Sequence, residues 1–416
     1  MAPTEHGQPI SGLAANPRRG IPGVTRNVVA LGFVSLLTDV STEMIIPVLP
    51  LFVTGVLKAS VASVGVIEGV AECTATILRI FSGWVSDRIG RRKPFLIFGY
   101  GISGVAKATL GIASSWGAVL GLRFTDRVGK GLRNPPRDAL IADSVETKYL
   151  GRAFGLHRAM DTLGAAIGPL VAFAMLSVYP GQFRKIFLVS AIPAALSVLV
   201  LAIFVRAPRR EAVKLRSLGL EARALGAPFH RFLLVAGMFS LASSSTAFLF
   251  LLARQAGYSD RQVPLLYLGY NLVYALLSWP VGELSDRIGR RSLLLLAYFS
   301  FAVLYAGLAW KASHVVVLVG FLVFGIHSAL LESSQRTMIA DLVPADRRAT
   351  AYGLYYAVVG LALLPASVIA GQIWDRIGAR ATFAVDAGLA LAAALLFALL
   401  LPPHGEYRDR NRTPAA

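Results

Sequence analysis

The sequence predicts an all-α membrane protein with twelve transmembrane helices, arranged as two pseudo-symmetric six-helix bundles. Three observations support this fold class. Of the 416 residues, 55% are hydrophobic and only 15% are charged, whereas soluble domains carry about 25% charged residues. Apolar segments long enough to cross a bilayer recur along the whole chain. Short motifs of the first half return in the second half at a nearly constant spacing, which indicates an internal duplication.

Twelve apolar segments follow a polar stretch that ends at Arg26. Each is about as long as a helix that crosses the hydrocarbon core. Because the number is even, both ends of the chain are expected on the same side of the membrane. The segments cover residues 28–55, 61–85, 94–113, 116–140, 153–178, 185–205, 231–253, 263–284, 292–310, 314–340, 350–373 and 381–401.

The longest polar connection lies after the sixth apolar segment and divides the chain into two halves. It is basic and contains Pro208 and Pro228. The first residues lack the order of regions found in a cleaved signal peptide, so we expect them to form a tail. The predicted organisation is a tail over 1–26, a bundle over 27–206, a linker over 207–230, a bundle over 231–402 and a tail over 403–416.

Basic residues are distributed unevenly between the two sides of the membrane. With the N-terminus in the cytoplasm, the loops and tails on that side contain about three times as many Lys and Arg residues as the opposite loops. This is the bias known for cytoplasmic loops. We therefore expect an integral protein of the cell inner (plasma) membrane with both termini in the cytoplasm. The same bias explains the net charge of +18, so no nucleic-acid partner is expected.

Three motifs recur in the two halves. Residues 86–92 return at 285–291, with an offset of 199 residues. Residues 141–143 return at 339–341 and residues 153–156 at 351–354, both with an offset of 198. A further echo at 375–378 lies on the opposite side of the membrane, as expected if each half contains an inverted repeat.

The repeated loop resembles the signature of the major facilitator superfamily between its helices 2 and 3 and between its helices 8 and 9. Its residues are Gly83, Asp87, Arg88, Gly90, Arg91 and Arg92 in the first half, and Gly282, Asp286, Arg287, Gly289 and Arg290 in the second. The chain is identified as a member of this superfamily, and its run from Gly129 to Asp143 is similar to a stretch in a prokaryotic branch with poorly known substrates. The resemblance implies a central cavity that opens alternately to each side. We interpret the loop as a conformational latch; a basic turn that only anchors the topology is the alternative.

Two further family signatures are partial. Arg123, Gly129 and Gly131 fit the helix 4 motif of the family, while Asp126 and Arg127 depart from it. Gly164, Gly168 and Pro169 resemble the helix 5 motif of antiporters, but Ala172 and Phe173 replace its last glycine pair. We expect these helix 5 residues to serve packing or a hinge. Pro135 and Pro136 are expected to interrupt helix 4, with a plain kink as the alternative.

Charged side chains occur inside the apolar segments, where each costs at least about 2.5–3.5 kcal/mol and therefore requires a partner or an aqueous cavity. The C-terminal half has few of them, so we place ion coupling in the N-terminal half. The candidates for proton coupling are Asp39, Glu43, Glu68, Glu72, His157 and Asp161. The candidates for the substrate cavity are Arg123, Asp126, Arg127, Lys130, Tyr267, Tyr270, Asn271, Glu332, Arg336, Tyr355 and Tyr356. Static salt bridges between helices 1, 2, 4 and 5 are the alternative.

These features predict a secondary active transporter, and not an enzyme, that works by alternating access. A phosphate-binding loop motif is absent from the sequence, so a proton gradient is the expected energy source, without a cofactor or resident metal. Proton-coupled efflux of a small organic solute or drug ranks first among the substrates. An organic anion held by Arg123, Arg127 and Lys130, or a divalent metal ion held by the acidic candidates and His157, are alternatives. A sensor or scaffold without transport is more remote. We expect a monomer whose partners are the solute and the lipid bilayer.

Overall fold

The computed structural model describes residues 21–89, 91–207, 225–344 and 347–401. Within these ranges the chain is helical and contains no strand, so the predicted all-α fold class is confirmed. The N-terminal bundle consists of α1 (Arg26–Glu43), α2 (Leu49–Gly55), α3 (Val61–Ile89), α4 (Lys93–Thr109), α5 (Trp116–Asp143), α6 (Leu150–Val178) and α7 (Phe183–Phe204), with short 3-10 turns at Leu110–Ile112 and Thr147–Tyr149. The C-terminal bundle consists of α8 (Ala227–Ala242), α9 (Ala247–Gln255), α10 (Val263–Ile288), α11 (Arg290–Trp310), α12 (His314–Leu342), α13 (Arg348–Arg376) and α14 (Ala379–Leu400).

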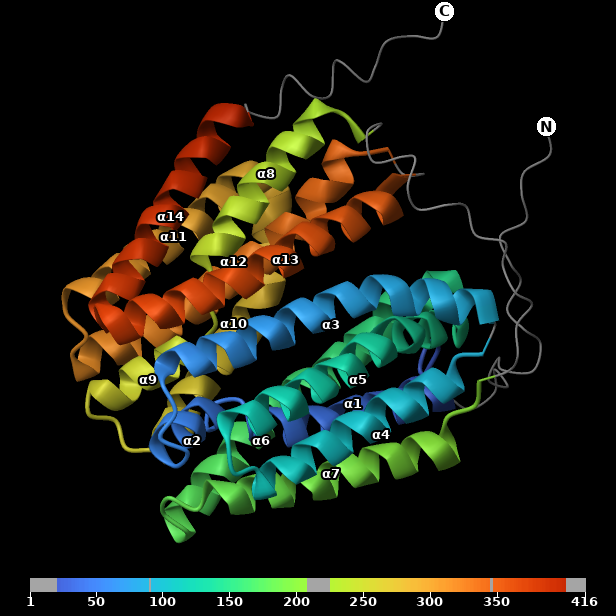
Figure 1. Ribbon diagram of the computed structural model, residues 1–416. Helices are drawn as coiled ribbons and strands as arrows, with labels where there is room; N and C mark the ends of the chain where they lie inside the picture. The colour runs from blue at the N-terminus through green and yellow to red at the C-terminus, as the bar shows by residue number, and fades with distance from the viewer. Residues whose placement is uncertain (1–20, 90, 208–224, 345–346, 402–416) are drawn as a thin grey trace, which may run out of the picture.

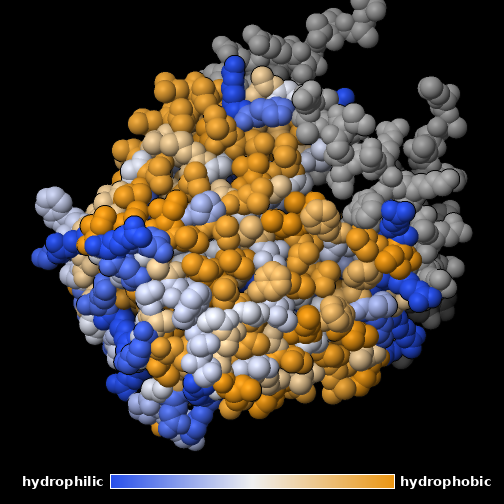
Figure 2. All heavy atoms as spheres, in the orientation of Figure 1, coloured by the Kyte–Doolittle hydropathy of each residue, from blue (hydrophilic) through white to orange (hydrophobic). Residues whose placement is uncertain are grey.

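Nine of the described helical segments are long and apolar enough to cross a membrane. The α1–α2 pair, α5 and α10 do not meet this criterion. Helix α1 contains Arg26, Asp39 and Glu43 within its 18 residues, α5 carries many charged residues, and tyrosines and Asn271 lower the hydropathy of α10. With these three the predicted number of twelve spans is reached, but the count itself stays a prediction. Figure 2 shows apolar side chains over the middle of the molecule and hydrophilic ones at the two ends of the view, as expected for a protein in a bilayer.

The first and seventh apolar segments are each broken, although both were expected to be continuous. Residues 44–48 separate α1 from α2, and residues 243–246 separate α8 from α9. Lys107 Nζ donates a 2.7 Å hydrogen bond to Thr42 Oγ1 beside the first break, where a positive charge suits the C-terminal end of α1. At the second break Ser244 Oγ donates to Asp386 Oδ2 at 2.5 Å. The two breaks lie at equivalent positions of the duplicated halves.

Helix α5 continues through Pro135 and Pro136, so the expected interruption was wrong. A proline inside a helix leaves the carbonyl four residues earlier without its usual donor. Here Ser82 Oγ of α3 donates a 2.7 Å hydrogen bond to the Gly131 carbonyl. The neighbouring helix therefore supplies the missing donor, which is how prolines are tolerated in membrane helices.

Ser82→Ala should destabilise the protein by about 1–3 kcal/mol, because it leaves a buried carbonyl without a donor. The measurement is the melting temperature of the purified protein in detergent. Ser177→Ala is the matched control, since Ser177 Oγ makes a bond of the same kind within α6, to the Phe173 carbonyl, at the exposed surface. Equal melting temperatures of the two variants would contradict this role of Ser82.

The two bundles meet along α3 with α13 and α6 with α10, and α2 packs against α9. In Figure 1, α3 and α13 lie side by side between the bundles. Glycines permit this approach: a Cβ atom at Gly65 would lie 2.2 Å from the Ser367 carbonyl oxygen, and one at Gly371 would lie 2.8 Å from Ala62 Cα. The bundles therefore touch through their backbones.

A carboxylate joins the bundles where α3 begins. The backbone N–H groups of Val61 and Ala62 donate to Asp375 Oδ1 and Oδ2 at 3.1 and 2.7 Å. Negative charge is favourable at a helix N-terminus, where backbone N–H groups lack partners. Asp375 belongs to the echo at 375–378, so this copy of the motif links the two bundles. We call this the closed end; the opposite end carries the α3–α4 and α10–α11 connections.

Candidate functional site

A cavity lies between the two bundles and consists of two overlapping parts. The inner chamber has a volume of about 490 Å³ and is lined by α1, α6, α10, α12 and α13. The vestibule has a volume of about 1140 Å³ and extends to Asp138, Phe154 and Gly353, which lie away from the closed end. The two parts share eight lining residues, among them Asp39 and Glu332. They therefore form one continuous space, and we call the end that the vestibule approaches the open end.

The inner chamber brings together candidate residues from both halves. Asp39, Glu43 and Asp161 come from the N-terminal bundle. The C-terminal bundle contributes a larger set, namely Tyr267, Tyr270, Asn271, Glu332, Arg336, Tyr355 and Tyr356. Two further candidates, Lys130 and His157, line the vestibule. The chamber thus has acidic groups on one wall and tyrosines on the other.

The carboxylate of Glu332 is the centre of a paired cluster in the chamber. Arg336 Nη2 donates to it at 2.7 Å, Arg158 Nη2 of the other bundle lies 3.8 Å away, and the Tyr274 hydroxyl donates to it. The guanidinium of Arg158 also contacts the Tyr274 hydroxyl. Glu332 therefore has basic partners from both bundles.

Three other carboxylates of the chamber have no Lys or Arg partner within ion-pair distance among the described residues. Glu43 Oε2 and Asp161 Oδ1 are buried without a hydrogen-bond partner. Asp161 Oδ2 lies 3.5 Å from His157 Nδ1 on the same face of α6. Asp39 lies one helical turn before Glu43 on α1. These acids are therefore available for groups that enter the chamber.

Two glycines of α6, Gly164 and Gly168, position this acidic wall; they belong to the motif assigned from the sequence to helix 5 of the family. A Cβ atom at Gly164 would lie 2.9 Å from Asp39 Cβ, and one at Gly168 would lie 2.7 Å from Glu43 Cβ. Because neither glycine has a side chain, α6 packs closely against α1 at these two levels. Pro169 follows Gly168 inside the continuous helix α6. The motif therefore serves close packing in this conformation.

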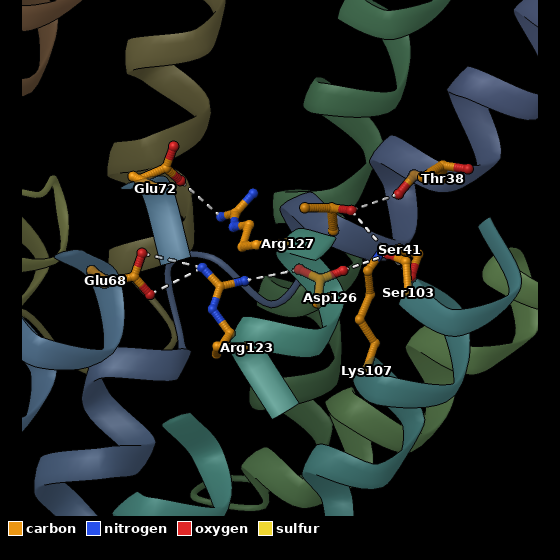
Figure 3. A network of polar contacts seen from close by, with 10 residues as sticks. Thr38, Ser41, Glu68, Glu72, Ser103, Lys107, Arg123, Asp126 and Arg127 are labelled. Carbon is orange, nitrogen blue, oxygen red and sulfur yellow. Dashed lines mark hydrogen bonds and ion pairs between the residues drawn. The ribbon is translucent and has the colours of Figure 1, made fainter. Parts of the chain in front are cut away.

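The remaining charged candidates form a separate network between α3 and α5, shown in Figure 3. Arg123 Nη2 donates to both Glu68 oxygens at 3.0 and 3.1 Å, and Arg123 Nη1 lies 3.4 Å from Asp126 Oδ2. Arg127 Nη2 pairs with Glu72 Oε1 at 3.1 Å. Ser103 donates to Asp126. None of these residues lines the inner chamber or the vestibule.

The repeated loops lie at the open end and form ion pairs within each bundle. Arg92 pairs with Asp143, and Arg290 pairs with Asp341. Both aspartates belong to the repeated motif at 141–143 and 339–341, but the two arginines are not equivalent, because Arg92 corresponds to Arg291 in the repeat. Gly90 and the side chains of Asp87 and Asp286 lie outside the described residues. A latch between the bundles at this end stays a prediction.

The other loop candidates surround these ion pairs. Arg88 and Arg91 are exposed, and Arg287 pairs with Glu283 at the surface. A Cβ atom at Gly83 would lie 3.3 Å from Pro135, while the space around Gly282 is open. Gly289 joins α10 to α11 with a positive φ of 89°, a conformation that favours glycine. The glycines thus permit the turn and the close packing at this end.

Several lining residues were not among the cavity candidates. Arg158 precedes Asp161 by three residues and Tyr274 follows Tyr270 by four, so helical spacing alone could have added both. Arg79 and Arg133 also line the vestibule; their position depends on how α3 and α5 turn in the bundle. Among the described residues, no group of three His, Cys, Asp or Glu side chains is arranged to hold a metal ion.

Comparisons with known proteins agree with this architecture. The family profile of the Major Facilitator Superfamily matches residues 31–252 and 232–415. A relative in Methanocaldococcus jannaschii, named as an uncharacterized MFS-type transporter, is 36% identical over 380 residues, which cover 90% of this chain and 94% of the relative. The chain is thus a membrane transporter. It belongs to the Major Facilitator Superfamily.

More distant similarities extend the comparison. The multidrug resistance protein MdtH of an Enterobacter species is 28% identical over 328 residues, 75% of this chain and 77% of that protein. The crystal structure of the nucleoside transporter NupG superposes with a TM-score of 0.76 at 14% identity, over 90% of this chain and 99% of that one. A bacterial homologue of the lysosomal transporter Spinster, in an inward-facing conformation, gives a TM-score of 0.74 at 18% identity, over 94% and 98%. These structures share the fold.

Proposed function

We propose that the protein is a secondary active transporter that exports a small organic solute across the inner membrane in exchange for protons. The observation that carries this proposal is the chamber, where three carboxylates without a Lys or Arg partner among the described residues face a wall of tyrosines. Carboxylates in such a cavity can gain and lose protons as their surroundings change. Tyrosine rings provide apolar contact for an organic body. The similarity to MdtH supports export as the direction.

In this proposal, Asp39, Glu43 and Asp161 take up and release protons. They lie in the space that both bundles share, so a conformational change that moves the opening would move their contact with water. Glu68 and Glu72 are weaker candidates, because each already pairs with an arginine of α5. The open end carries the basic loops, which we place in the cytoplasm. The described conformation would then be open to the cytoplasm and closed on the opposite side.

The test is a solute-induced loss of the pH gradient in everted membrane vesicles that are energised by respiration. Drugs, organic anions and divalent metal ions are added in turn. We expect at least one organic solute to dissipate the gradient with the wild-type protein. Asp161→Asn should reduce this response to that of vesicles without the protein, because the amide cannot carry a proton.

Glu146→Gln is the control for this test, since Glu146 pairs with Lys148 at the exposed surface. It should respond like the wild-type protein. A response of Asp161→Asn equal to that of the wild type would remove Asp161 from proton coupling. A response only to divalent metal ions would favour the metal alternative, although Glu68 and Glu72 do not approach the chamber. No response to any solute would contradict proton antiport.

A further inference from the structure

The vestibule contains three basic side chains that remain after all ion pairs are assigned. Among the described cavity residues, Arg137 pairs with Asp138, and Arg158 and Arg336 share Glu332. Arg79, Lys130 and Arg133 also line the vestibule. Within the part of the chain that the structure describes, none of these three has a carboxylate within ion-pair distance.

Two of these bases have unused hydrogen-bond donors. Arg79 Nε and Arg133 Nη1 are buried without a hydrogen-bond partner among the described atoms. The Arg133 guanidinium lies over the Tyr100 ring, 4.5 Å from the ring centroid. This contact with the face of the ring provides no hydrogen-bond acceptor for Arg133 Nη1. A buried donor without a partner is costly. An anionic group in the vestibule would supply acceptors for these donors.

The unpaired acids and the unpaired bases occupy different walls. The acids Asp39, Glu43 and Asp161 project from α1 and α6 into the inner chamber. The bases project from α3 and α5 and line the vestibule, which the three acids also line. The vestibule therefore presents three acidic groups from α1 and α6 and three basic groups from α3 and α5, and the acids alone continue into the inner chamber. Among the described residues, the ion-pair contact that either set makes is that of Asp161 with His157, at 3.5 Å.

We propose that the substrate is a zwitterion, with an ammonium group toward the acids and a carboxylate or phosphate group toward the bases. This proposal rests on the proposed function and narrows the class of solute. A purely cationic solute would leave the vestibule donors unsatisfied, and a purely anionic one would leave the chamber carboxylates unmatched. Buried charges are stable only when they are paired. A dipolar solute offers a partner to both walls, and an ammonium carboxylate also leaves the net charge of the cavity unchanged.

The experiment measures binding of matched solutes to the purified full chain in detergent, read as the shift in melting temperature. One set shares an aromatic body and consists of tyramine, tyrosine and 3-(4-hydroxyphenyl)propionate. A second set consists of ethanolamine, phosphoethanolamine and ethyl phosphate. We expect the zwitterion to give the largest shift in at least one set. The set in which it does so distinguishes a carboxylate from a phosphate.

Two variants then assign the ends of the bound solute. Lys130→Gln should lower the shift by the zwitterion to that of the cation in its set, and Asp161→Asn should lower it to that of the anion. Arg79→Gln replaces Lys130→Gln if the latter does not fold. Lys148→Gln in the exposed loop should change neither.

The proposal is overturned if a cation or an anion stabilises the wild-type protein as much as its zwitterion, or if neither zwitterion binds. An unchanged shift by the zwitterion in folded Lys130→Gln and Arg79→Gln would also overturn it. In that case water molecules, and not a solute, would supply the hydrogen-bond partners of the unpaired acids and bases. Binding is measured without a membrane gradient, so these outcomes are independent of proton antiport. The vesicle experiment can fail while the zwitterion binds, and the reverse also holds.

Discussion

A valine at position 65 should force the protein out of the conformation in which α3 packs against α13. The Cβ atom alone would lie 2.2 Å from the Ser367 carbonyl oxygen. That oxygen belongs to the backbone of α13, so it can withdraw only if the helix moves. We therefore expect Gly65→Val to separate α3 from α13 and to open the closed end. The measurement is the distance between spin labels at Lys58→Cys and Arg261→Cys, which lie in exposed turns at that end, in a Cys73→Ser background.

The expected result is a longer distance at the closed end and a shorter one between labels at Lys148→Cys and Arg348→Cys at the open end. Gly121→Val is the matched control, because nothing lies within 4 Å of a Cβ atom at Gly121. Asp375→Asn should shift the distances in the same direction but less, since a charge at a helix N-terminus contributes about 0.3–1 kcal/mol. Unchanged distances in Gly65→Val would contradict this expectation, because they would show that α3 and α13 accommodate the side chain without separating.

The fold class could be predicted from the sequence because the patterns that indicate it, hydropathy and repeated motifs, extend over the whole chain. Hydropathy and the offset of 198–199 residues between repeated motifs do not depend on any single contact. The breaks in the first and seventh segments depend on local contacts instead. Pro47 marks the first break, but residues 243–246 contain no proline. The break there coincides with the buried contact between Ser244 and Asp386, which sequence spacing does not predict.

The candidate site could be predicted only in part, for a similar reason. Asp39 and Glu43 are four residues apart on α1, and Glu68 and Glu72 are four apart on α3. The two patterns are identical, and both indicate faces that avoid lipid. The structure separates them: the first pair lines the chamber, and the second meets Arg123 and Arg127. The two pairs differ in what the neighbouring helix places against them, and the residue spacing along one helix carries no information about its neighbour.

Replacing Arg123 should destabilise the protein more than replacing Ser82. The Arg123 side chain is buried, with 3% of its surface exposed, and it contacts both Glu68 and Asp126. Removing one partner of a buried ion pair leaves an uncompensated charge and costs about 3–5 kcal/mol. Arg123→Gln should therefore melt well below the wild-type protein in detergent, whether or not a solute is present.

The double variant Arg123→Gln/Glu68→Gln separates lost charge balance from lost packing. If the loss in Arg123→Gln comes from the unpaired Glu68 carboxylate, neutralising that carboxylate should restore part of the melting temperature. Lys148→Gln removes an exposed pair with Glu146 and should have little effect, because surface pairs contribute about 0–1 kcal/mol. If Arg123→Gln instead melts like the wild type while solute flux is lost, the network between α3 and α5 takes part in transport. The charges of α5 would then act in the transport cycle, and the division between a structural network and a functional cavity would be wrong.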